Sequence, residues 1–383
     1  MTSPARNRAA TRPIAARDES QAADAPPPAP DVDCVGMTLA EFAAARGSHP
    51  QAVRAEYAAR MRGGIGLPLP VTQVDRRDGV TKFCLAVGSG SGTLESESVI
   101  IPMNSYRGTD WHTLCVSSQV GCRMGCTFCE TARMGWLRNL SAGDIVAQRL
   151  AARQLMPGRG AAQGRFRYFA DGIQNIVFMG MGEPFDNFEP VIQAIRVLNE
   201  PCGLDFPLTQ ITISTVGRVD GLRQLAALAR AADRDRDWRN LRLAISLTAA
   251  DDRLRDVLMP INRGMPLAEL QRALLEYPLS RKGRYLIQYV LIRDVNDSLA
   301  DADAVAAWCR PLPCVVNVIP YNPQRDAAYA TPSEDIVLRF MLRLRDQGIF
   351  VKRRITRGRD LMGACGQLGN PALRRRPHNQ PAA

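Results

Sequence analysis

The pattern of apolar and polar positions divides the chain into a segment without periodicity, a short mixed region and a long α/β region. Residues 1–33 are dominated by Ala, Pro, Arg and Asp, so we expect a disordered tail. Residues 36–62 have helical periodicity, which begins with Thr38 and Glu41 in a capping-box pattern. Residues 79–102 alternate as strands, with Gly88–Gly92 as the turn. We therefore interpret residues 34–102 as a small accessory domain.

From residue 103 onward, apolar strands alternate with helical stretches, which predicts a parallel α/β sheet. About six such units favour an open or partial barrel over a two-faced sheet, and we assign residues 103–368 to it. The predicted strands are Thr113–Ser117, Ile176–Gly180, Ile211–Thr215, Leu243–Leu247, Leu286–Ile292, Val315–Ile319 and Phe350–Ile355. The predicted helices are Ala142–Leu155, Phe188–Asn199, Val219–Ala232, Leu267–Tyr277, Asp301–Arg310 and Glu334–Gln347. A basic, flexible tail is expected at residues 369–383.

The composition is that of an ordinary globular protein with a basic excess. The chain has 383 residues, 46% hydrophobic and 23% charged, which excludes a wholly disordered or collagen-like chain. Lys and Arg number 49 against 38 Asp and Glu, a formal net charge of +11, and only Lys82, Lys282 and Lys352 are lysines. Arginine forms forked contacts with phosphate, so a polyanionic partner fits, although a GC-rich genome would also favour arginine over lysine.

Membrane and export signals are missing from the sequence pattern. No run of about 18 apolar residues occurs, so we expect no membrane span, and no apolar stretch typical of a secretory signal follows the N-terminus. Met1–Arg17 is rich in Arg and Ala, as in a transit peptide, but we favour a disordered tail of a cytoplasmic protein. Ten cysteines in such a chain are better explained as free thiols, metal ligands or catalytic groups than as disulfides.

Three of these cysteines are closely spaced directly after the first barrel strand. Cys122, Cys126 and Cys129 form a C-x3-C-x2-C loop with an aromatic residue before the last cysteine. Three thiolates from one loop can hold three corners of an iron–sulfur cube, which leaves the fourth iron open to a substrate. A structural zinc site is the alternative, but it normally needs four ligands in two pairs, and no second CxxC pair exists.

This loop resembles the signature of the radical S-adenosylmethionine (SAM) superfamily. The resemblance implies a partial (β/α)6 radical-SAM barrel in which a 4Fe-4S cluster binds SAM through its open iron. An electron from the cluster then splits the sulfonium to give a 5′-deoxyadenosyl radical. In such enzymes the cofactor supplies the chemistry, and the protein supplies orientation and shielding.

Polar residues at the ends of later strands are candidates to bind SAM, because the carboxyl ends of barrel strands carry the chemistry. Gly182 and Glu183 lie in a glycine-rich turn that resembles the superfamily's motif for the methionyl amine, and the carboxylate can accept from an ammonium group. Hydroxyl and amide groups after the next strands could bind ribose and carboxylate. These further candidates are Ser214, Ser246, Leu247, Thr248 and Asn322.

The sequences around two outlying cysteines, Cys115 and Cys365, closely resemble those of one family, the RlmN/Cfr RNA adenine methyltransferases. An isolated cysteine is usually a small core residue. This fits Cys34, Cys84, Cys202, Cys309 and Cys314 better than it fits Cys365, which glycines bracket in a basic segment. The match runs roughly from Glu97 to Gln367, and its motifs are Leu114–Cys122, Arg138–Leu140, Gly180–Pro184, Arg255–Asn262, Tyr321–Pro323 and Ala364–Gln367.

The resemblance implies a methyl relay that consumes two SAM molecules per turnover. Adenine carbon-2 is a poor nucleophile, so a carbon radical must add to it. By resemblance, Cys365 takes the first methyl group, and the adenosyl radical from a second SAM activates that methyl group for addition to the base. Cys115 then resolves the protein–RNA adduct by forming a transient disulfide with Cys365. Glu97 matches the family's proton acceptor, although from the residues alone it is an exposed strand carboxylate.

The resemblance also implies RNA as substrate, with rRNA and also tRNA as candidates. Basic clusters at Arg281–Arg284, Lys352–Arg359 and Arg374–Arg376 could bind phosphate, with the accessory domain contributing to recognition. A reducing donor such as flavodoxin or ferredoxin and a monomeric state are expected.

Two departures leave alternatives open. Thr248 replaces the family's usual histidine, and the N-terminal region lacks the family's Trp-containing helical pattern. Carbon-2 of an adenine in 23S rRNA is the favoured target, with carbon-8 or another RNA as alternatives. A non-catalytic iron–sulfur or zinc protein that binds RNA, or a radical enzyme that acts on a small molecule or a protein, are the competing hypotheses.

Overall fold

A ten-stranded sheet carries the fold. The computed structural model describes residues 34–64, 68–88, 94–104, 110–156, 172–231, 236–325 and 327–369. The predicted tail of residues 1–33 lies outside this range, as does the predicted tail of residues 369–383 apart from Gly369. The strand order is β1-β2-β3-β4-β7-β8-β9-β10-β11-β12. The bounds are β1 Val71–Arg77, β2 Val80–Val87, β3 Leu94–Asn104, β4 Asp110–Cys115, β7 Ile173–Phe178, β8 Ile211–Thr215, β9 Arg242–Ser246, β10 Tyr285–Leu291, β11 Cys314–Pro320 and β12 Val351–Arg353.

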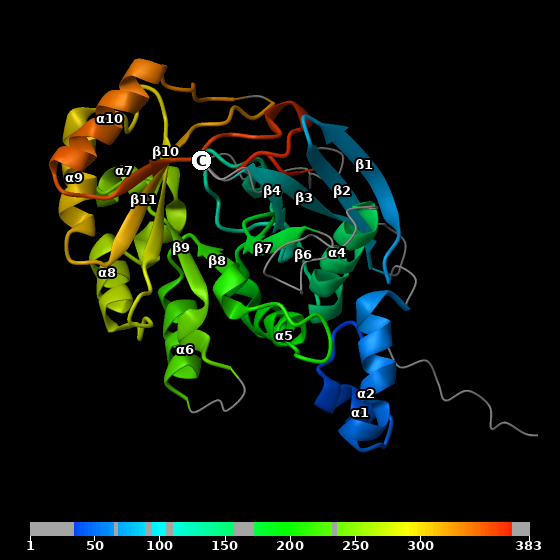
Figure 1. Cartoon of the computed structure of the whole chain (residues 1–383). Coiled ribbons are helices and arrows are strands. Elements are labelled where there is room, and N and C mark those ends of the chain that lie inside the picture. Colours follow the sequence, from blue (N-terminus) through cyan, green and yellow to red (C-terminus); the bar gives the residue numbers. More distant parts are fainter. Residues whose placement is uncertain are drawn as a thin grey trace, which may run out of the picture. The chain divides into compact units, whose positions relative to one another are not determined.

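The sheet has a parallel part and an antiparallel part. The strands β4, β7, β8, β9, β10, β11 and β12 pair in parallel in that order. The strands β1, β2 and β3 pair antiparallel, and β3 joins them to β4, again antiparallel. Figure 1 shows β1–β3 at one end of the sheet and β10 and β11 at the other. The parallel strands form the predicted partial barrel. The expected boundary between residues 102 and 103 falls within β3.

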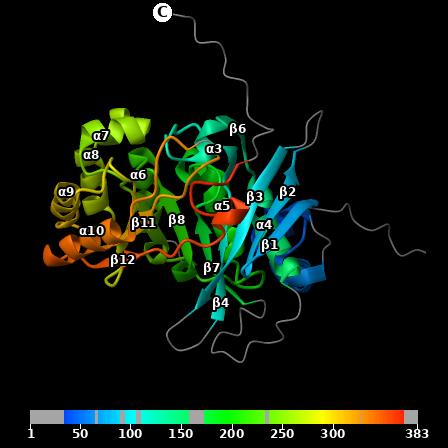
Figure 2. The same cartoon turned by 90° about the horizontal axis from the view of Figure 1, so that it is seen from above.

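The helices lie along the outside of the parallel strands (Figures 1 and 2). Their bounds are α3 Glu130–Arg133, α4 Ala142–Leu155, α5 Phe188–Leu198, α6 Val219–Arg230, α7 Asp252–Leu258, α8 Leu267–Glu276, α9 Leu299–Cys309 and α10 Glu334–Asp346. In α5 the residues Val191, Ile192, Ile195 and Leu198 are buried, the spacing of one helical face toward the sheet. Parallel strands are covered on both faces, so they consist mostly of buried apolar residues, as in β9 and β10.

The helical stretch expected over residues 36–62 begins at its predicted cap but is divided into separate helices. These are α1, Leu39–Ala45, and α2, Pro50–Ala59, and the capping box of Thr38 and Glu41 is present. The chain turns between them at Gly47, which has φ of 60°. Tyr57 of α2 is fully buried and donates to the Met37 carbonyl oxygen at 2.8 Å, which fixes the helix pair.

Several short elements escaped the sequence pattern. The edge strand β1 is mostly polar and exposed, so it lacks the alternation of a half-buried strand. The helices α3 and α7 are too short to show a clear period. A separate two-stranded sheet, β5 Gln119–Gly121 with β6 Trp136–Asn139, brackets the cysteine loop.

The described residues also test two simpler expectations. No helix among them is long and apolar enough to cross a bilayer. The five cysteines interpreted as core residues, Cys34, Cys84, Cys202, Cys309 and Cys314, are all buried.

Candidate active site

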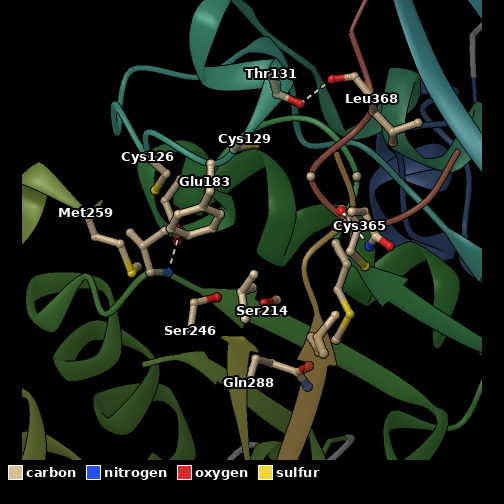
Figure 3. A pocket seen from close by; sticks show the side chains of 18 of the residues that line it. Cys126, Cys129, Thr131, Glu183, Ser214, Ser246, Met259, Gln288, Cys365 and Leu368 are labelled. Atoms are coloured by element: carbon tan, nitrogen blue, oxygen red, sulfur yellow. Dashed lines mark hydrogen bonds between the residues drawn. The ribbon is translucent and has the colours of Figure 1, made fainter. Parts of the chain in front are cut away.

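The site is a cavity at the carboxyl ends of the parallel strands, where residues from distant parts of the chain meet. It encloses about 940 Å³, part of it open to solvent, and is lined by the ends of β7–β11, the cysteine loop and the C-terminal segment, residues 354–369. Figure 3 shows Cys126, Cys129, Glu183, Ser214, Ser246 and Cys365 around it. Most of the strand-end positions predicted from sequence therefore face one space.

The cysteine loop is fixed by its own neighbourhood. The Cys122 amide donates to Gly135 O at 2.9 Å, and Thr127 N donates to Leu258 O at 3.0 Å. Met124, Leu258 and Met259 surround the loop with apolar side chains. These contacts hold the three thiols beside the cavity, although residues 122–129 form neither a helix nor a strand.

The three thiols share a buried, mutually repulsive environment. Burial is the main cause that raises the pKa of Cys122, Cys126 and Cys129, and the negative charges of the neighbouring thiolates raise those of Cys122 and Cys126 further. Such a set of donors is stable as thiolates only when cationic metal neutralises it.

The donor set fits an iron–sulfur cluster better than a single ion. Among the described residues, no group of three or more Cys, His, Asp or Glu side chains is gathered closely enough to hold one metal ion. A cube binds each thiolate at a different iron, so its ligands lie farther apart than those of a single tetrahedral zinc ion. Three cysteines on one short loop match that need.

The glycines of the next strand end allow two turns to touch. A Cβ on Gly180 would lie 2.7 Å from Val116 O, and a Cβ on Gly182, where φ is 98°, would lie 2.6 Å from the Gln119 side chain. Gly180 N donates to Val116 O at 3.1 Å. The turns after β4 and β7 are therefore packed backbone against backbone, which requires glycine there.

Glu183 is held rigidly with its carboxylate at the cavity. Its oxygens accept from Phe185 N at 3.1 Å and Val216 N at 2.9 Å, and its own amide donates to Gln119 Oε1 at 2.9 Å. Burial raises the pKa of Glu183 to about 7, although these hydrogen bonds and Arg218 oppose the shift. A cation bound beside the carboxylate would offset the free-energy cost of burying its negative charge.

The other strand-end candidates divide into two groups. Ser214, Ser246 and Asn322 line the cavity, whereas Leu247 and Thr248 are buried and do not line it. Thr248 has φ of 56°, and its hydroxyl has no partner among the described residues. The sequence thus located the end of β9 correctly, but the turn that follows directs the side chains of Leu247 and Thr248 away from the cavity.

The strand ends are held together by Arg255, which sequence periodicity did not single out. It is fully buried and donates to Val216 O at 2.6 Å, Ser246 O at 3.1 Å and Asn262 Oδ1 at 2.6 Å. Burial lowers the pKa of this guanidinium to about 10. One cation therefore satisfies carbonyl groups at the ends of β8 and β9 and places their loops.

The C-terminal segment is seated across the cavity by contacts to distant residues. Asn322 Nδ2 donates to Cys365 O at 3.2 Å, and Glu130 N donates to Gly366 O at 2.7 Å. Thr131 Oγ1 donates to Leu368 O at 2.6 Å (Figure 3). Asn322, predicted to contact a ligand, thus also holds the backbone that carries Cys365.

Cys115 and Cys365, 250 positions apart, lie close enough for their charges to interact. Burial and then the neighbouring Cys365 thiol raise the pKa of Cys115 to about 12, while the Arg354 guanidinium lowers it. Cys365 also faces the cysteine loop, since its charge raises the pKa of Cys129. Cys365 is half-buried and lines the cavity.

Glu97 lies behind the C-terminal segment and does not line the cavity. It is 3% exposed, and its Oε2 lies 2.7 Å from Lys82 Nζ and accepts from Gly369 N at 3.2 Å. Lys82 Nζ is 3.4 Å from Met362 O, so it too contacts the segment. The interpretation of Glu97 as an exposed carboxylate is wrong, because β2 and the segment cover it.

The basic clusters lie at different ends of the barrel. Arg281–Arg284 precede β10, so they lie at the amino ends of the strands, away from the cavity. Lys352–Arg359 begin within β12 and continue past its carboxyl end, and Arg354 lines the cavity. Arg374–Arg376 lie outside the described residues.

Comparisons with known proteins place the chain in one family. Residues 116–303 match the model of the Radical SAM superfamily. The dual-specificity RNA methyltransferase RlmN of Syntrophotalea carbinolica is 39% identical over 82% of this chain and 76% of its own length. The RlmN of Methylorubrum extorquens is 40% identical over 79% of this chain and 69% of its own.

A solved structure agrees with the sequence matches. The crystal structure of a radical SAM methyltransferase from Sphaerobacter thermophilus has a TM-score of 0.74 and 35% identity, and the alignment covers 87% of this chain and 98% of that one. Membership of the superfamily implies a 4Fe-4S cluster and SAM. With this fold, cysteine loop and degree of identity, the chain belongs to the RlmN family of radical SAM RNA methyltransferases.

Proposed function

We propose that this enzyme methylates carbon-2 of an adenine in 23S rRNA, and also in tRNA, through a methyl group carried on Cys365. The similar Syntrophotalea protein is a dual-specificity RNA methyltransferase, which supports two RNA targets. The observation that carries the proposal is the meeting of Cys115 and Cys365 beside the loop of Cys122, Cys126 and Cys129. A protein that only binds RNA has no need of this second pair of thiols.

The strand ends would bind the cofactors. Cys122, Cys126 and Cys129 would hold a 4Fe-4S cluster, which when bound supplies the electron that splits SAM and starts the radical chemistry. Glu183, fixed by two backbone donors, would accept hydrogen bonds from the methionyl ammonium group. Gly182 allows close approach of the ligand, and further contacts to SAM would come from Ser214, Ser246 and Asn322, whereas the side chains of Leu247 and Thr248 do not line the cavity.

The two outlying thiols would act in a fixed order. Cys365 is half-buried at the cavity, so it can take a methyl group from one SAM by displacement and later present it to the base. Cys115 is buried, and the charge of Cys365 disfavours its thiolate. Once Cys365 is a neutral thioether, that repulsion is gone and Arg354 still favours the Cys115 thiolate. Cys115 then attacks the Cys365 sulfur, and a disulfide releases the methylated base.

Glu97 would take the proton from the ring carbon. Its carboxylate is covered by Gly369 N and paired with Lys82, so the base can reach it only after residues 364–369 shift. A shift that extends to Met362 would also release the Lys82 contact to Met362 O. The pair with Lys82 holds the carboxylate in place until that moment.

RNA would approach the cavity over the basic end of the C-terminal segment. Arg354 lines the cavity, and Lys352 and Arg357 lie on the same stretch of chain. Phosphate contacts there would make binding strongly salt-dependent. A flavodoxin or ferredoxin would supply electrons to a monomeric enzyme, with two SAM consumed per turnover.

Trapping the covalent intermediate tests the proposal. Cys115→Ala, purified anaerobically under reducing conditions with ample SAM, should carry RNA joined to Cys365, which mass spectrometry of the protein detects. The Cys115→Ala/Cys365→Ala double variant should carry none, and Cys202→Ala, a buried cysteine elsewhere, should behave as wild type.

Nucleoside analysis of RNA from a deletion strain identifies the modified atom. Loss of 2-methyladenosine from 23S rRNA and tRNA would support the proposed target, and loss of 8-methyladenosine would replace it. A Cys115→Ala protein without bound nucleotide would refute the methyl relay.

A further inference from the structure

The side chain of Gln288 is a buried carboxamide without a partner. Gln288 lies on β10 and is 5% exposed, and its backbone oxygen accepts from Leu247 N at 2.9 Å in the parallel ladder. Its Oε1 and Nε2 make no hydrogen bond with any residue that the structure describes. Buried polar atoms are nearly always paired, so this amide needs a partner other than the residues that the structure describes.

The unpaired amide faces the proposed active site. Gln288 lines the cavity and is in register with Ser246 of β9. Figure 3 shows its side chain on the same side of the cavity as Ser214 and Ser246. Val290 and Ile319 line the cavity as well and offer apolar surface to a flat ring.

A second buried glutamine shows what a purely structural one looks like in this protein. Gln148 of α4 is fully buried, and its Oε1 accepts from Ser98 Oγ and Ser117 N, both at 2.7 Å. Its Nε2 donates to Ser117 O at 2.9 Å. Gln288 has none of these internal partners, which separates its role from that of Gln148.

We propose that the carboxamide of Gln288 binds the edge of an adenine ring in this cavity. The inference rests on the proposed function and identifies a residue that would bind its substrates. The amide offers one acceptor and one donor side by side, so its ligand must present the complementary pair. The adenine amino group with the adjacent ring nitrogen is that pair, and glutamine binds it with two hydrogen bonds. SAM and the target nucleotide both contain adenine, and the experiment separates these sources.

Stability of the ligand-free protein forms the first arm. Gln288→Met replaces the amide with an apolar chain of similar shape, so its denaturation midpoint should equal or exceed that of wild type. Gln148→Met, the matched control, should lower the midpoint because it leaves Ser98 and Ser117 unpaired. If Gln288→Met lowers the midpoint as much as the control does, Gln288 is structural and the proposal is overturned.

Binding to the anaerobically reconstituted protein forms the second arm. If the cofactor is the source, Gln288→Met should weaken S-adenosylhomocysteine about tenfold. Wild type should also discriminate against S-inosylhomocysteine, which lacks the amino group, more strongly than the variant does. If the target base is the source, the variant should weaken binding of an unmodified 23S rRNA transcript and leave S-adenosylhomocysteine unchanged.

Unchanged affinity for both probes would mean that the amide binds only water and would overturn the proposal. Failure of the proposed function is a separate result. Wild type would then bind S-adenosylhomocysteine and RNA but form no methyladenosine, and the comparison of affinities between wild type and Gln288→Met would still stand.

Discussion

The cysteine loop and the C-terminal segment both bring thiols to the cavity, but they are built in opposite ways. The loop of Cys122–Cys129 lies between β5 and β6 and combines local bonds, such as that from Cys122 N to Gly135 O, with contacts to Leu258 in the barrel. The C-terminal segment is held by residues more than 200 positions away, through Lys82, Glu97 and Thr131. A rigid local loop suits a resident cluster, whereas a segment seated by separable contacts suits a thiol that must carry a group and then release it.

The largest expected effect comes from removing one thiol of each kind. Cys126→Ala should lose the cluster, 5′-deoxyadenosine formation and RNA methylation together. Cys365→Ala should keep iron and 5′-deoxyadenosine formation and lose methylation completely, because only the carrier thiol is missing. Iron analysis, nucleoside chromatography and a methylation assay measure the three quantities. If Cys365→Ala lost its iron as well, the assignment of cluster binding to the cysteine loop and of methyl transfer to the C-terminal segment would be wrong.

The next effect concerns the ion pair under the C-terminal segment. Lys82→Met leaves Glu97 buried and unpaired, which should lower the free energy of unfolding by about 3–5 kcal/mol. Lys82→Met/Glu97→Gln should recover most of this, since no charge is then buried. Urea denaturation of the ligand-free proteins measures the free energy of unfolding of each variant. Arg339→Met, which breaks an exposed pair with Asp335, should stay within about 0.5 kcal/mol. Equal losses for Lys82→Met and Arg339→Met would contradict the buried pair.

Glu183 should give the barrel side of the cavity a pH dependence that the C-terminal segment lacks. Its pKa rises from 4.5 to about 7 on folding, so the folded protein holds a proton that the unfolded chain releases. The ligand-free protein should lose on the order of 3 kcal/mol of stability relative to Glu183→Gln as the pH rises from about 4.5 through about 7. Denaturation of both proteins at pH 4 and pH 8 measures the difference. A constant gap between them across this range would mean that the carboxyl is not shifted.

The smallest effect should come from a single contact of the C-terminal segment. Thr131→Val removes the hydrogen bond to Leu368 O and should cost about 1 kcal/mol of stability. It should also slow methylation. Because the Thr131 side chain also hydrogen-bonds Cys129, its cluster spectrum is compared with that of Thr127→Val, on the cysteine loop itself, which removes an exposed contact to Tyr329. Unchanged methylation in Thr131→Val would show that the contact to Leu368 O does not seat the segment.

The sequence by itself determined the parts whose signals are local. Periodicity located the helices α4–α6 and α8–α10 and the parallel strands to within a few residues, because an apolar face must repeat with the period of its own element. The spacing of Cys122, Cys126 and Cys129 indicated a cluster loop, since three ligands on one short stretch need no distant residue. The resemblance in chain order singled out Cys115, Glu97 and Cys365, but their spatial relation was not readable from the pattern.

Only the tertiary structure decided which distant groups meet. It buried Glu97 against Lys82, brought Arg354 beside Cys115, and turned Thr248 away from the cavity. It also left the Gln288 amide facing the cavity without a partner, although in sequence Gln288 is one polar residue in an apolar strand. Such facts depend on how β2, β3, β10 and residues 354–369 pack around one space, and a pairing across 250 positions leaves no period or spacing in the chain.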